Sequence, residues 1–407
     1  MIDRSEYLNI LKEWKGKQII KVITGIRRCG KSTLLSLFQV YLKNNGINEE
    51  QIISINFEKM EYEDLLDYKE LYAHIKARLL PDQPMYIFLD EIQQVKSYEK
   101  VVDSLYVQDN IDIYITGSNS HMFSGQLATT LRGRYIEINM LPLSFNEYLT
   151  LSEKTKTAAF AEYMRTGGFP YVNTMDLSAE NHAMYIEGIY NTVLLKDIEE
   201  RLNRKARSGK NSSITDVALL KSVSKYLSGV IGSPVSIRSI SNYMISNERK
   251  VSPNTVSDYV TALCDAYLYY PVEQMDISGK EVLKSNKKYY IVDLGLRNYI
   301  LPRRNYDLGF SIENIVYLEL IRRRYEVYIG KTGSNEVDFV AKKNNEYTYL
   351  QVTANMTDEA TFEREISPLR KIHDNYEKII LTLDEYTPGN YDGIKVINLL
   401  EWLTDYH

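Results

Sequence analysis

The chain has 407 residues, of which 44% are hydrophobic and 25% charged, and its formal net charge is −5, so we expect a globular protein of two to four domains at roughly 100–200 residues each. It has no run of about 18 apolar residues and no basic region followed by an apolar stretch at its start, so we expect neither a membrane span nor a secretion signal. Cys29 and Cys264 are too few for a disulfide framework, and together these features predict a cytoplasmic protein.

The first predicted strand, residues 19–24, leads into a G-x-x-x-x-G-K-S motif and then a helical pattern up to residue 42. A strand, this motif and a helix in that order predict a phosphate-binding loop. Its glycines let backbone N–H groups turn inward around phosphate oxygens. The positive end of the helix favours the anion. The expected nucleotide-binding residues are Gly25, Ile26, Arg27, Arg28, Cys29, Gly30, Lys31, Ser32 and Thr33.

Within this loop, Lys31 is expected to reach the β- and γ-phosphates and Ser32 to offer its hydroxyl to Mg²⁺. Cys29 is interpreted as a small filler, with a redox role as the alternative. A second buried strand is predicted at residues 51–57 and a third at 84–91, which ends in Asp90 and Glu91. Asp90 would hold the magnesium ion through water, and Glu91 would polarise the attacking water. The alternative is a solvated acidic turn.

A fourth predicted strand, from residue 112, ends in the small polar residues Ser118 and Asn119. Either side chain could contact the γ-phosphate or the attacking water, and a simple turn is the alternative. Arg132 and Arg134 come just before a fifth predicted strand. An arginine that reaches the γ-phosphate of a neighbouring subunit would stabilise charge in the transition state. A plain salt bridge is the alternative.

The order phosphate loop, acidic pair, polar strand tip and arginine resembles the AAA+ ATPase superfamily over residues 1–155. The resemblance implies a Mg²⁺-dependent ATPase in which Lys31, Ser32, Thr33, Asp90 and Glu91 form the nucleotide site. It makes Ser118 or Asn119 the first sensor. It also implies a homo-oligomeric ring or partial ring in which Arg134, with Arg132 as second choice, is the arginine finger.

Residues 156–210 are expected to form a helical lid or linker, interrupted by a tight turn at Gly167-Gly168-Phe169-Pro170. Residues 201–250 contain ten lysines and arginines against two carboxylates, a local charge of +8. Such a charge asymmetry is typical of an anion-binding face. The candidate basic DNA contacts are Arg204, Lys205, Arg207 and Lys210.

Residues 211–303 contain three short helical patterns followed by two apolar strands, at residues 267–272 and 288–292. Three helices and a ribbon predict a winged helix, whose third helix would place Ser252, Asn254 and Thr255 in a DNA major groove. A protein-docking module with the same fold is the alternative.

Residues 304–407 show the order α-β-β-β-α-β, which resembles the PD-(D/E)xK nuclease fold. Glu313 and Asp338 match its helix and strand acids. Gln351 and Thr353 stand where that family carries a metal-binding glutamate and a lysine, so we expect a non-catalytic relative.

The whole chain is similar to a prokaryotic group of uncharacterised ATPases, on the markers Thr-Gly-Ile-Arg-Arg-Cys-Gly-Lys-Ser-Thr, Gly-Gly-Phe-Pro, Ser-Pro-Asn-Thr-Val and Glu-Val-Asp-Phe-Val. The expected fold is thus an α/β P-loop NTPase of AAA+ type, then a helical and winged-helix domain, then an α/β restriction-nuclease-like domain. The expected function is ATP hydrolysis, with ATP/ADP and double-stranded DNA as partners. A signalling or scaffold ATPase with protein-binding modules, or an ATP-dependent nuclease, remains open.

Overall fold

The computed structural model describes residues 2–120, 131, 133–174, 178–193, 198, 216–301, 308–333, 335–385 and 387–404. The chain divides into two compact units: Met1–Pro142 with Asp265–Tyr267, and Leu143–Cys264 with Leu268–His407. Among the described residues, no helix combines the length and the apolar composition needed to cross a membrane.

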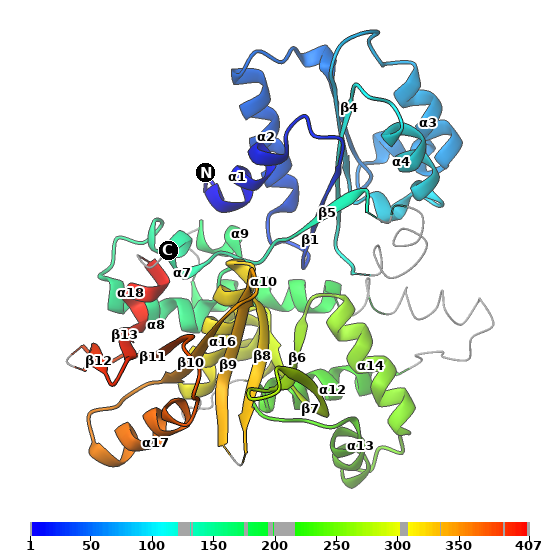
Figure 1. The fold of residues 1–407 in the computed structure, drawn as a ribbon. Coiled ribbons are helices and arrows are strands. Elements are labelled where there is room, and N and C mark those ends of the chain that lie inside the picture. The colour runs from blue at the N-terminus through cyan, green and yellow to red at the C-terminus, as the bar shows by residue number, and fades with distance from the viewer. Residues whose placement is uncertain are drawn as a thin grey trace. The chain divides into compact units, whose positions relative to one another are not determined.

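The first unit is built on a five-stranded sheet with the order β2-β3-β4-β1-β5, in which every pairing is parallel (Figure 1). Because the strands are parallel, their carboxyl ends meet at one edge. The elements of this unit in chain order are α1 (Ser5–Trp14), β1 (Ile20–Thr24), α2 (Lys31–Asn44), η1 (Glu49–Gln51), β2 (Ile52–Asn56), η2 (Met60–Leu66), α3 (Tyr68–Lys76), β3 (Met85–Asp90), η3 (Ile92–Gln94), α4 (Tyr98–Tyr106), β4 (Ile111–Gly117) and β5 (Tyr135–Asn139).

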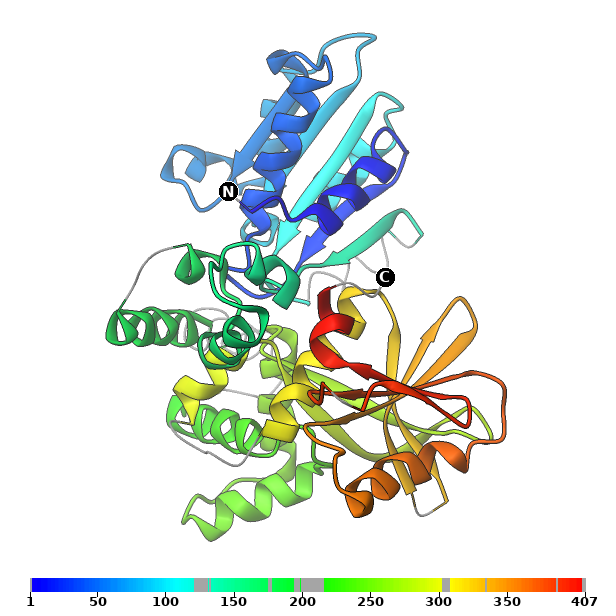
Figure 2. The same cartoon turned by 90° about the vertical axis from the view of Figure 1, so that its left-hand side faces the viewer.

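Helices cover both faces of this sheet, which explains why its central strands read as continuous apolar runs. On one face, Phe38 of α2 contacts the rings of Phe88 in β3 and Tyr114 in β4. On the other face, Leu105 of α4 shares a buried cluster with Ile87 of β3. Successive side chains of a strand point to opposite faces, so Ile87 and Phe88 face different helices. Figure 2 shows α1 and α2 together on one face.

The second unit combines a group of helices with an eight-stranded mixed sheet of order β12-β13-β11-β10-β9-β8-β6-β7. Its elements are α7 (Phe145–Leu149), α8 (Lys156–Thr166), α9 (Pro170–Asn173), α10 (Ala179–Thr192), α12 (Val217–Gly229), α13 (Ile237–Ser246), α14 (Pro253–Asp265), β6 (Tyr269–Asp276), β7 (Glu281–Ile291), α15 (Leu294–Ile300), α16 (Leu308–Arg322), β8 (Glu326–Thr332), β9 (Asn335–Lys343), β10 (Glu346–Thr353), α17 (Glu359–Arg370), β11 (Glu377–Thr382), β12 (Gly389–Tyr391), β13 (Ile394–Asn398) and α18 (Leu399–Thr404).

A helix covers each face of this second sheet. Phe339 of β9 contacts the ring of Tyr317 in α16, whereas its neighbour Val340 shares a buried cluster with Ile366 of α17. Adjacent residues of a strand point to opposite faces, so α16 and α17 lie on different sides. The order α16-β8-β9-β10-α17-β11 is the α-β-β-β-α-β order read from the sequence.

The ribbon expected at residues 267–272 and 288–292 is present as β6 and β7, with longer strands than predicted. It does not stand apart from the C-terminal region, because β6 pairs in parallel with β8. The strands assigned from sequence to a winged helix therefore extend the sheet assigned to a nuclease-like domain. The domain boundary expected near residue 304 therefore lies between β7 and β8, which are strands of the same sheet.

Candidate nucleotide site

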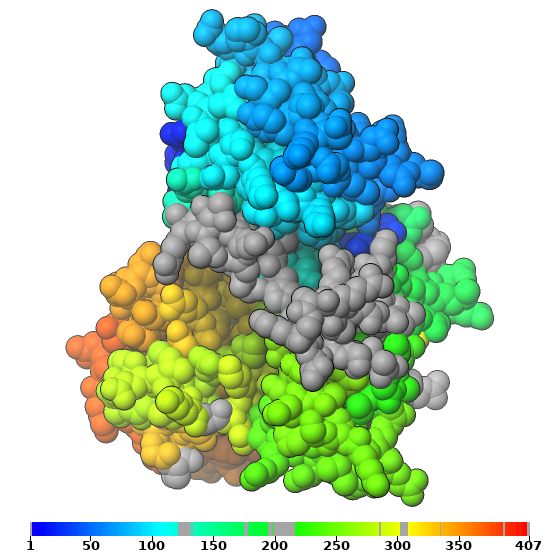
Figure 3. All heavy atoms as spheres, turned by 90° about the vertical axis from the view of Figure 1, so that its right-hand side faces the viewer, coloured from blue at the N-terminus to red at the C-terminus, as the bar shows by residue number. Residues whose placement is uncertain are grey.

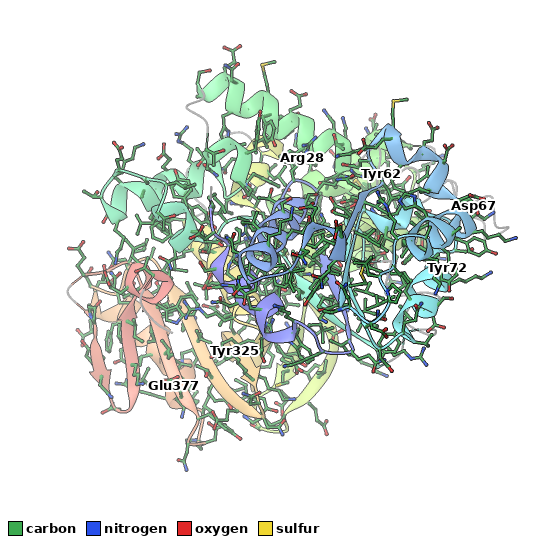
Figure 4. The ribbon with its side chains drawn as sticks, turned by 90° about the horizontal axis from the view of Figure 1, so that it is seen from above. Arg28, Tyr62, Asp67, Tyr72, Tyr325 and Glu377 are labelled. Carbon is green, nitrogen blue, oxygen red and sulfur yellow. The ribbon has the colours of Figure 1, made fainter. Side chains whose placement is uncertain are left out.

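The loop between β1 and α2 has the backbone geometry that its two glycines allow. Gly25 has a φ of 138°, and a Cβ there would lie 2.1 Å from the carbonyl oxygen of Met140. Gly30 has a φ of 105° immediately before α2. Arg28 also has a positive φ, 67°, and its exposed side chain lies at the surface (Figure 4). The side chain of Cys29 is fully buried, as expected of a filler.

Lys31, the first residue of α2, folds back over this loop. Its ammonium donates hydrogen bonds to the carbonyl oxygens of Gly25 (2.9 Å) and Ile26 (3.2 Å). It also lies 3.7 Å from the carboxylate of Glu91. The side chain is only 4% exposed, so this cation is held inside the loop by backbone carbonyls and one acid.

Asp90, the last residue of β3, is held by polar side chains from two neighbouring strands. Thr116 of β4 donates a hydrogen bond to one carboxylate oxygen, and Asn56 of β2 donates to the other at 2.7 Å. Burial raises the pKa of Asp90, and hydrogen bonds from Thr116 and the Ser32 hydroxyl act in the opposite direction. Asp90 is thus fixed in orientation beside the first turn of α2.

Glu91 follows directly, with a φ of 57°, and its backbone N–H donates to the hydroxyl of Thr116 at 2.8 Å. Its carboxylate accepts hydrogen bonds from Ser118, at 3.0 Å, and from Gln93. Burial acts to raise the pKa of Glu91, but the Lys31 and Arg27 cations and these hydrogen bonds outweigh it and lower the pKa. The side chain is therefore a charged carboxylate held beside the loop at neutral pH.

The N-terminal segment braces the loop from behind. Arg4 is 3% exposed, and its guanidinium donates to the carbonyl oxygens of Cys29 (3.3 Å) and Leu141 (2.6 Å). The Arg4 guanidinium also lies over the ring of Tyr7, 5.0 Å from its centroid. The hydroxyl of Tyr7 accepts a hydrogen bond from the N–H of Leu141. Arg4 thereby ties the phosphate-loop backbone to the segment after β5.

Of the two predicted arginines, Arg134 is the one among the described residues. Arg134 is ion-paired with Asp103 of α4 and lies over the ring of Tyr106. Arg132 lies outside the described residues. Arg27 pairs with Glu58 at 2.8 Å. The role of Arg134 as an arginine finger stays a prediction.

Sequence reasoning missed three polar residues that contact the acidic pair: Asn56, Gln93 and Thr116. A signal existed for two of them. Thr116 lies in β4 two residues before Ser118, and alternate residues of an extended chain point to the same side. Asn56 ends β2 at the same sheet edge. Gln93 lies in the turn that follows Glu91. No strand pattern in the sequence predicts the position of its side chain.

Of the candidate DNA-contacting residues, Arg204, Lys205, Arg207 and Lys210 lie outside the described part of the chain. Ser252 and Asn254 are exposed at the start of α14. The hydroxyl of Ser252 accepts a hydrogen bond from the backbone N–H of Thr255 at 3.1 Å. It therefore caps the helix, as Ser does before a proline at the first turn.

The residues at the edge of the first sheet suit a magnesium–nucleotide complex. Backbone N–H groups of a loop with two positive-φ glycines form an anion cradle, and a cradle of this kind has no room for a Cβ at Gly25. The hydroxyl of Ser32 and the carboxylate of Asp90 are oxygen ligands of the type that Mg²⁺ prefers. Lys31 is close enough to the loop to compensate phosphate charge.

Comparisons with known proteins agree with this geometry. An AAA domain matches residues 17–149, and two domains of unknown function, DUF8612 and DUF4143, match residues 157–307 and 308–402. The solved structure of a Walker-type ATPase of Pyrococcus abyssi is similar, with a TM-score of 0.50 at 15% identity, over 74% of this chain and 96% of that one. This likeness supports the P-loop AAA+ fold of the first unit.

Two relatives match nearly the full length. An uncharacterised protein of Haemophilus influenzae is 38% identical over 99% of this chain and 98% of its own length. An uncharacterised protein of Methanocaldococcus jannaschii is 30% identical over 93% of this chain and 84% of its own. In this chain the AAA domain is followed by the DUF8612 and DUF4143 domains. The chain belongs to the same family as these two proteins, a family of P-loop AAA+ proteins.

Proposed function

We propose that this protein hydrolyses ATP in a Mg²⁺-dependent reaction at the edge of its first sheet. The observation that carries the proposal is the convergence of Lys31, Asp90, Glu91 and Ser118 on that edge from α2, β3 and β4. These are the parts that phosphoryl transfer needs: a cation for the phosphates, a carboxylate for the metal and a group that orients water.

The contacts of Lys31 indicate how the site would change when nucleotide binds. Its ammonium rests on the carbonyl oxygens of Gly25 and Ile26 and near Glu91. A phosphate in the loop offers it a stronger, doubly charged partner, so we expect Lys31 to leave those carbonyls. Glu91 then loses the neighbouring Lys31 cation but keeps its hydrogen bond from Ser118. That hydrogen bond orients the Glu91 carboxylate, which would polarise the attacking water.

Ser32 and Asp90 would hold the magnesium ion, which neutralises phosphate charge when bound. Thr116 and Asn56 keep Asp90 in place for this role. Ser118 stands at the strand tip between Glu91 and Gln93, to which it is hydrogen-bonded. As a sensor, Ser118 would contact the γ-phosphate and change its hydrogen bonds to Glu91 and Gln93 when the phosphate is present.

The test compares three purified variants for binding of a fluorescent ATP analogue and for phosphate release. Lys31→Ala should lose nucleotide binding, and Glu91→Gln should bind ATP but hydrolyse it slowly. Lys43→Ala is the matched control, because Lys43 is an exposed lysine on the same helix, ion-paired with Glu49, and should behave as wild type. Wild-type binding by Lys31→Ala would refute the assignment.

As a second step, we propose that nucleotide state controls binding of double-stranded DNA by the second unit. Helices α12, α13 and α14 precede the β6–β7 ribbon, and Val235, between α12 and α13, forms an antiparallel bridge with Lys287 of β7. Three helices with a strand-like segment paired to a ribbon support the winged-helix interpretation. These helices form one exposed face of the unit, drawn in green in Figure 3.

DNA binding is tested with labelled duplex at about 50 mM salt, where phosphate contacts are strong, with and without ATP. Asn254→Ala should weaken binding, while Asn390→Ala, an exposed asparagine on β12, should not. An absence of salt-dependent affinity would reject this part and favour the scaffold alternative, in which the same modules bind protein.

A further inference from the structure

The second unit holds a buried lysine among carboxylates at the place where the nuclease resemblance expects a metal site. Lys288 lies in β7, and its side chain is only 4% exposed. Its ammonium is 3.2 Å from a carboxylate oxygen of Glu313 on α16 and 2.9 Å from one of Glu336 on β9. The sequence predicts Glu313 as an acid of a nuclease-like site, but no pattern in the sequence places a residue of β7 beside it.

Both glutamates have a further partner besides Lys288. The hydroxyl of Tyr290 donates to Glu313 at 2.6 Å, to the same oxygen that accepts from Lys288. Lys331 of β8 lies 3.3 Å from the second oxygen of Glu336. A Cβ placed on Gly232 would come within 3.3 Å of both Glu313 oxygens, so the backbone there closes one side of the carboxylate. Two lysines thus contact the two glutamates.

The other expected acid is also held by the protein itself. Asp338 accepts a hydrogen bond from the backbone N–H of Val352 at 2.8 Å. Gln351, which stands where the nuclease family has a metal-binding glutamate, accepts from the N–H of Asp338 at 3.3 Å and donates to Glu365 at 3.0 Å. Over the residues that the structure describes, no three His, Cys, Asp or Glu side chains gather as a metal site. These residues do not fit a divalent cation.

We propose that Lys288 is a built-in cation that occupies the place of a metal ion between Glu313 and Glu336, which closes this site to divalent cations. An ammonium with three N–H donors can satisfy carboxylates at hydrogen-bond distance, and its fixed charge repels a second cation. A buried lysine paired in this way costs much to remove, because unpaired carboxylates would remain. The nuclease-like sheet is then a structural and binding element without metal chemistry.

The test measures Mn²⁺ binding to the nucleotide-free full chain by calorimetry, in an Asp90→Asn background so that the nucleotide site does not contribute. The parent protein should bind no Mn²⁺ at millimolar concentration. Lys288→Gln should gain one Mn²⁺ site, and its unfolding temperature should rise with Mn²⁺. Lys331→Gln is the matched control, because Lys331 contacts the same Glu336 but is one-third exposed, and it should gain none.

If Lys288→Gln does not fold by itself, it is refolded in the presence of Mn²⁺, because a metal ion between Glu313 and Glu336 would replace the positive charge that was removed. A folded variant that gains no Mn²⁺ site overturns the proposal. So does a Mn²⁺ site in the parent protein that Asp338→Asn abolishes, because metal and lysine would then coexist. Neither outcome depends on ATP hydrolysis, so the proposed ATPase stands or falls separately.

Discussion

The carboxylate of Asp293 accepts a 2.6 Å hydrogen bond from the backbone N–H of Gly168. Its other oxygen accepts from the N–H of Leu296 and caps α15. Gly167 lies so close that a Cβ there would be 2.1 Å from the carboxylate. This contact explains the Gly-Gly-Phe-Pro sequence: the turn that ends α8 is shaped around a buried acid 125 residues away.

Asp293 should make the stability of the second unit pH-dependent. Burial raises its pKa to about 6, although the N–H donors of Gly168, Leu296 and Gly295 act to lower it. Because the pKa of the folded state exceeds the ordinary value of 3.8, the folded protein binds this proton more tightly than the unfolded chain does. The resulting stabilisation is complete below pH 3.8 and is lost as the pH rises through about 6.

We therefore expect the free energy of unfolding of wild type, relative to Asp293→Asn, to fall by up to about 3 kcal/mol between about pH 4 and about pH 7. Asn cannot ionise, so it removes this titration, and the loss of one of the two acceptor oxygens lowers its stability by an amount that does not change with pH. Urea denaturation followed by the fluorescence of Trp402, in a Trp14→Phe background, reports on the second unit. A difference between the two proteins that does not change with pH would contradict the prediction.

The Thr116 hydroxyl is expected to matter for turnover more than for nucleotide binding. It donates to Asp90 and accepts from the N–H of Glu91, so it orients both acids. Thr116→Val keeps the shape of the side chain and removes the hydroxyl. Replacing a residue that orients a metal ligand in this way typically lowers metal affinity or activity by roughly 10–100-fold. We expect a loss of that size in kcat, recovered in part by Thr116→Ser.

The control for this experiment is Thr382→Val, because Thr382 is an equally buried strand-end threonine in the second unit, whose hydroxyl accepts from the N–H of Asp384. It should lose stability and keep its turnover. Equal turnover by Thr116→Val and wild type would show that the hydroxyl is only structural.

Arg4 should set the affinity of the phosphate loop for ATP. Its guanidinium bridges the carbonyl oxygens of Cys29 and Leu141, which a lysine ammonium cannot span with the same geometry. Arg4→Lys keeps the charge, so we expect the KM for ATP to rise by about tenfold while kcat changes less. Arg78→Lys, on an exposed arginine bonded to His74, should leave both constants unchanged. A lower kcat at constant KM would place Arg4 outside the loop's binding role.

Sequence predicted most of the first unit because its chemistry is local. The Gly25–Ser32 loop and Ser118 follow buried strands, Asp90 is the last residue of another, and parallel strands bring their ends to one edge. The strand ends predicted around residues 24, 57, 91 and 119 agree to within a few residues with the observed ends at 24, 56, 90 and 117.

The second unit depends on contacts that no local pattern contains. The place of β6 beside β8 is set by pairing across more than fifty residues, and the contact between Lys288 and Glu313 follows from it. Arg4 is similar: an arginine near the start of a chain gives no sign that it will be buried 137 residues away against Leu141. A motif identifies its residues from the sequence alone, whereas these partners meet only because distant segments fold together.

Arg134, which is ion-paired with Asp103, has two alternative roles: an arginine finger for a neighbouring subunit, or a surface salt bridge. Both side chains are more than one-third exposed, and exposed pairs contribute about 0–1 kcal/mol, so a neighbouring subunit's phosphate could readily replace Asp103.

If Arg134 acts in trans, Arg134→Ala should lose most turnover at concentrations where the protein assembles, and Asp103→Ala should not. Mixing Arg134→Ala with Glu91→Gln should then restore activity, because a mixed assembly pairs an intact Glu91 with an intact Arg134 across one interface. Phosphate release measured against protein concentration, with sedimentation of the same samples, decides the matter: full turnover by a dilute monomer would leave Arg134 as a surface salt bridge.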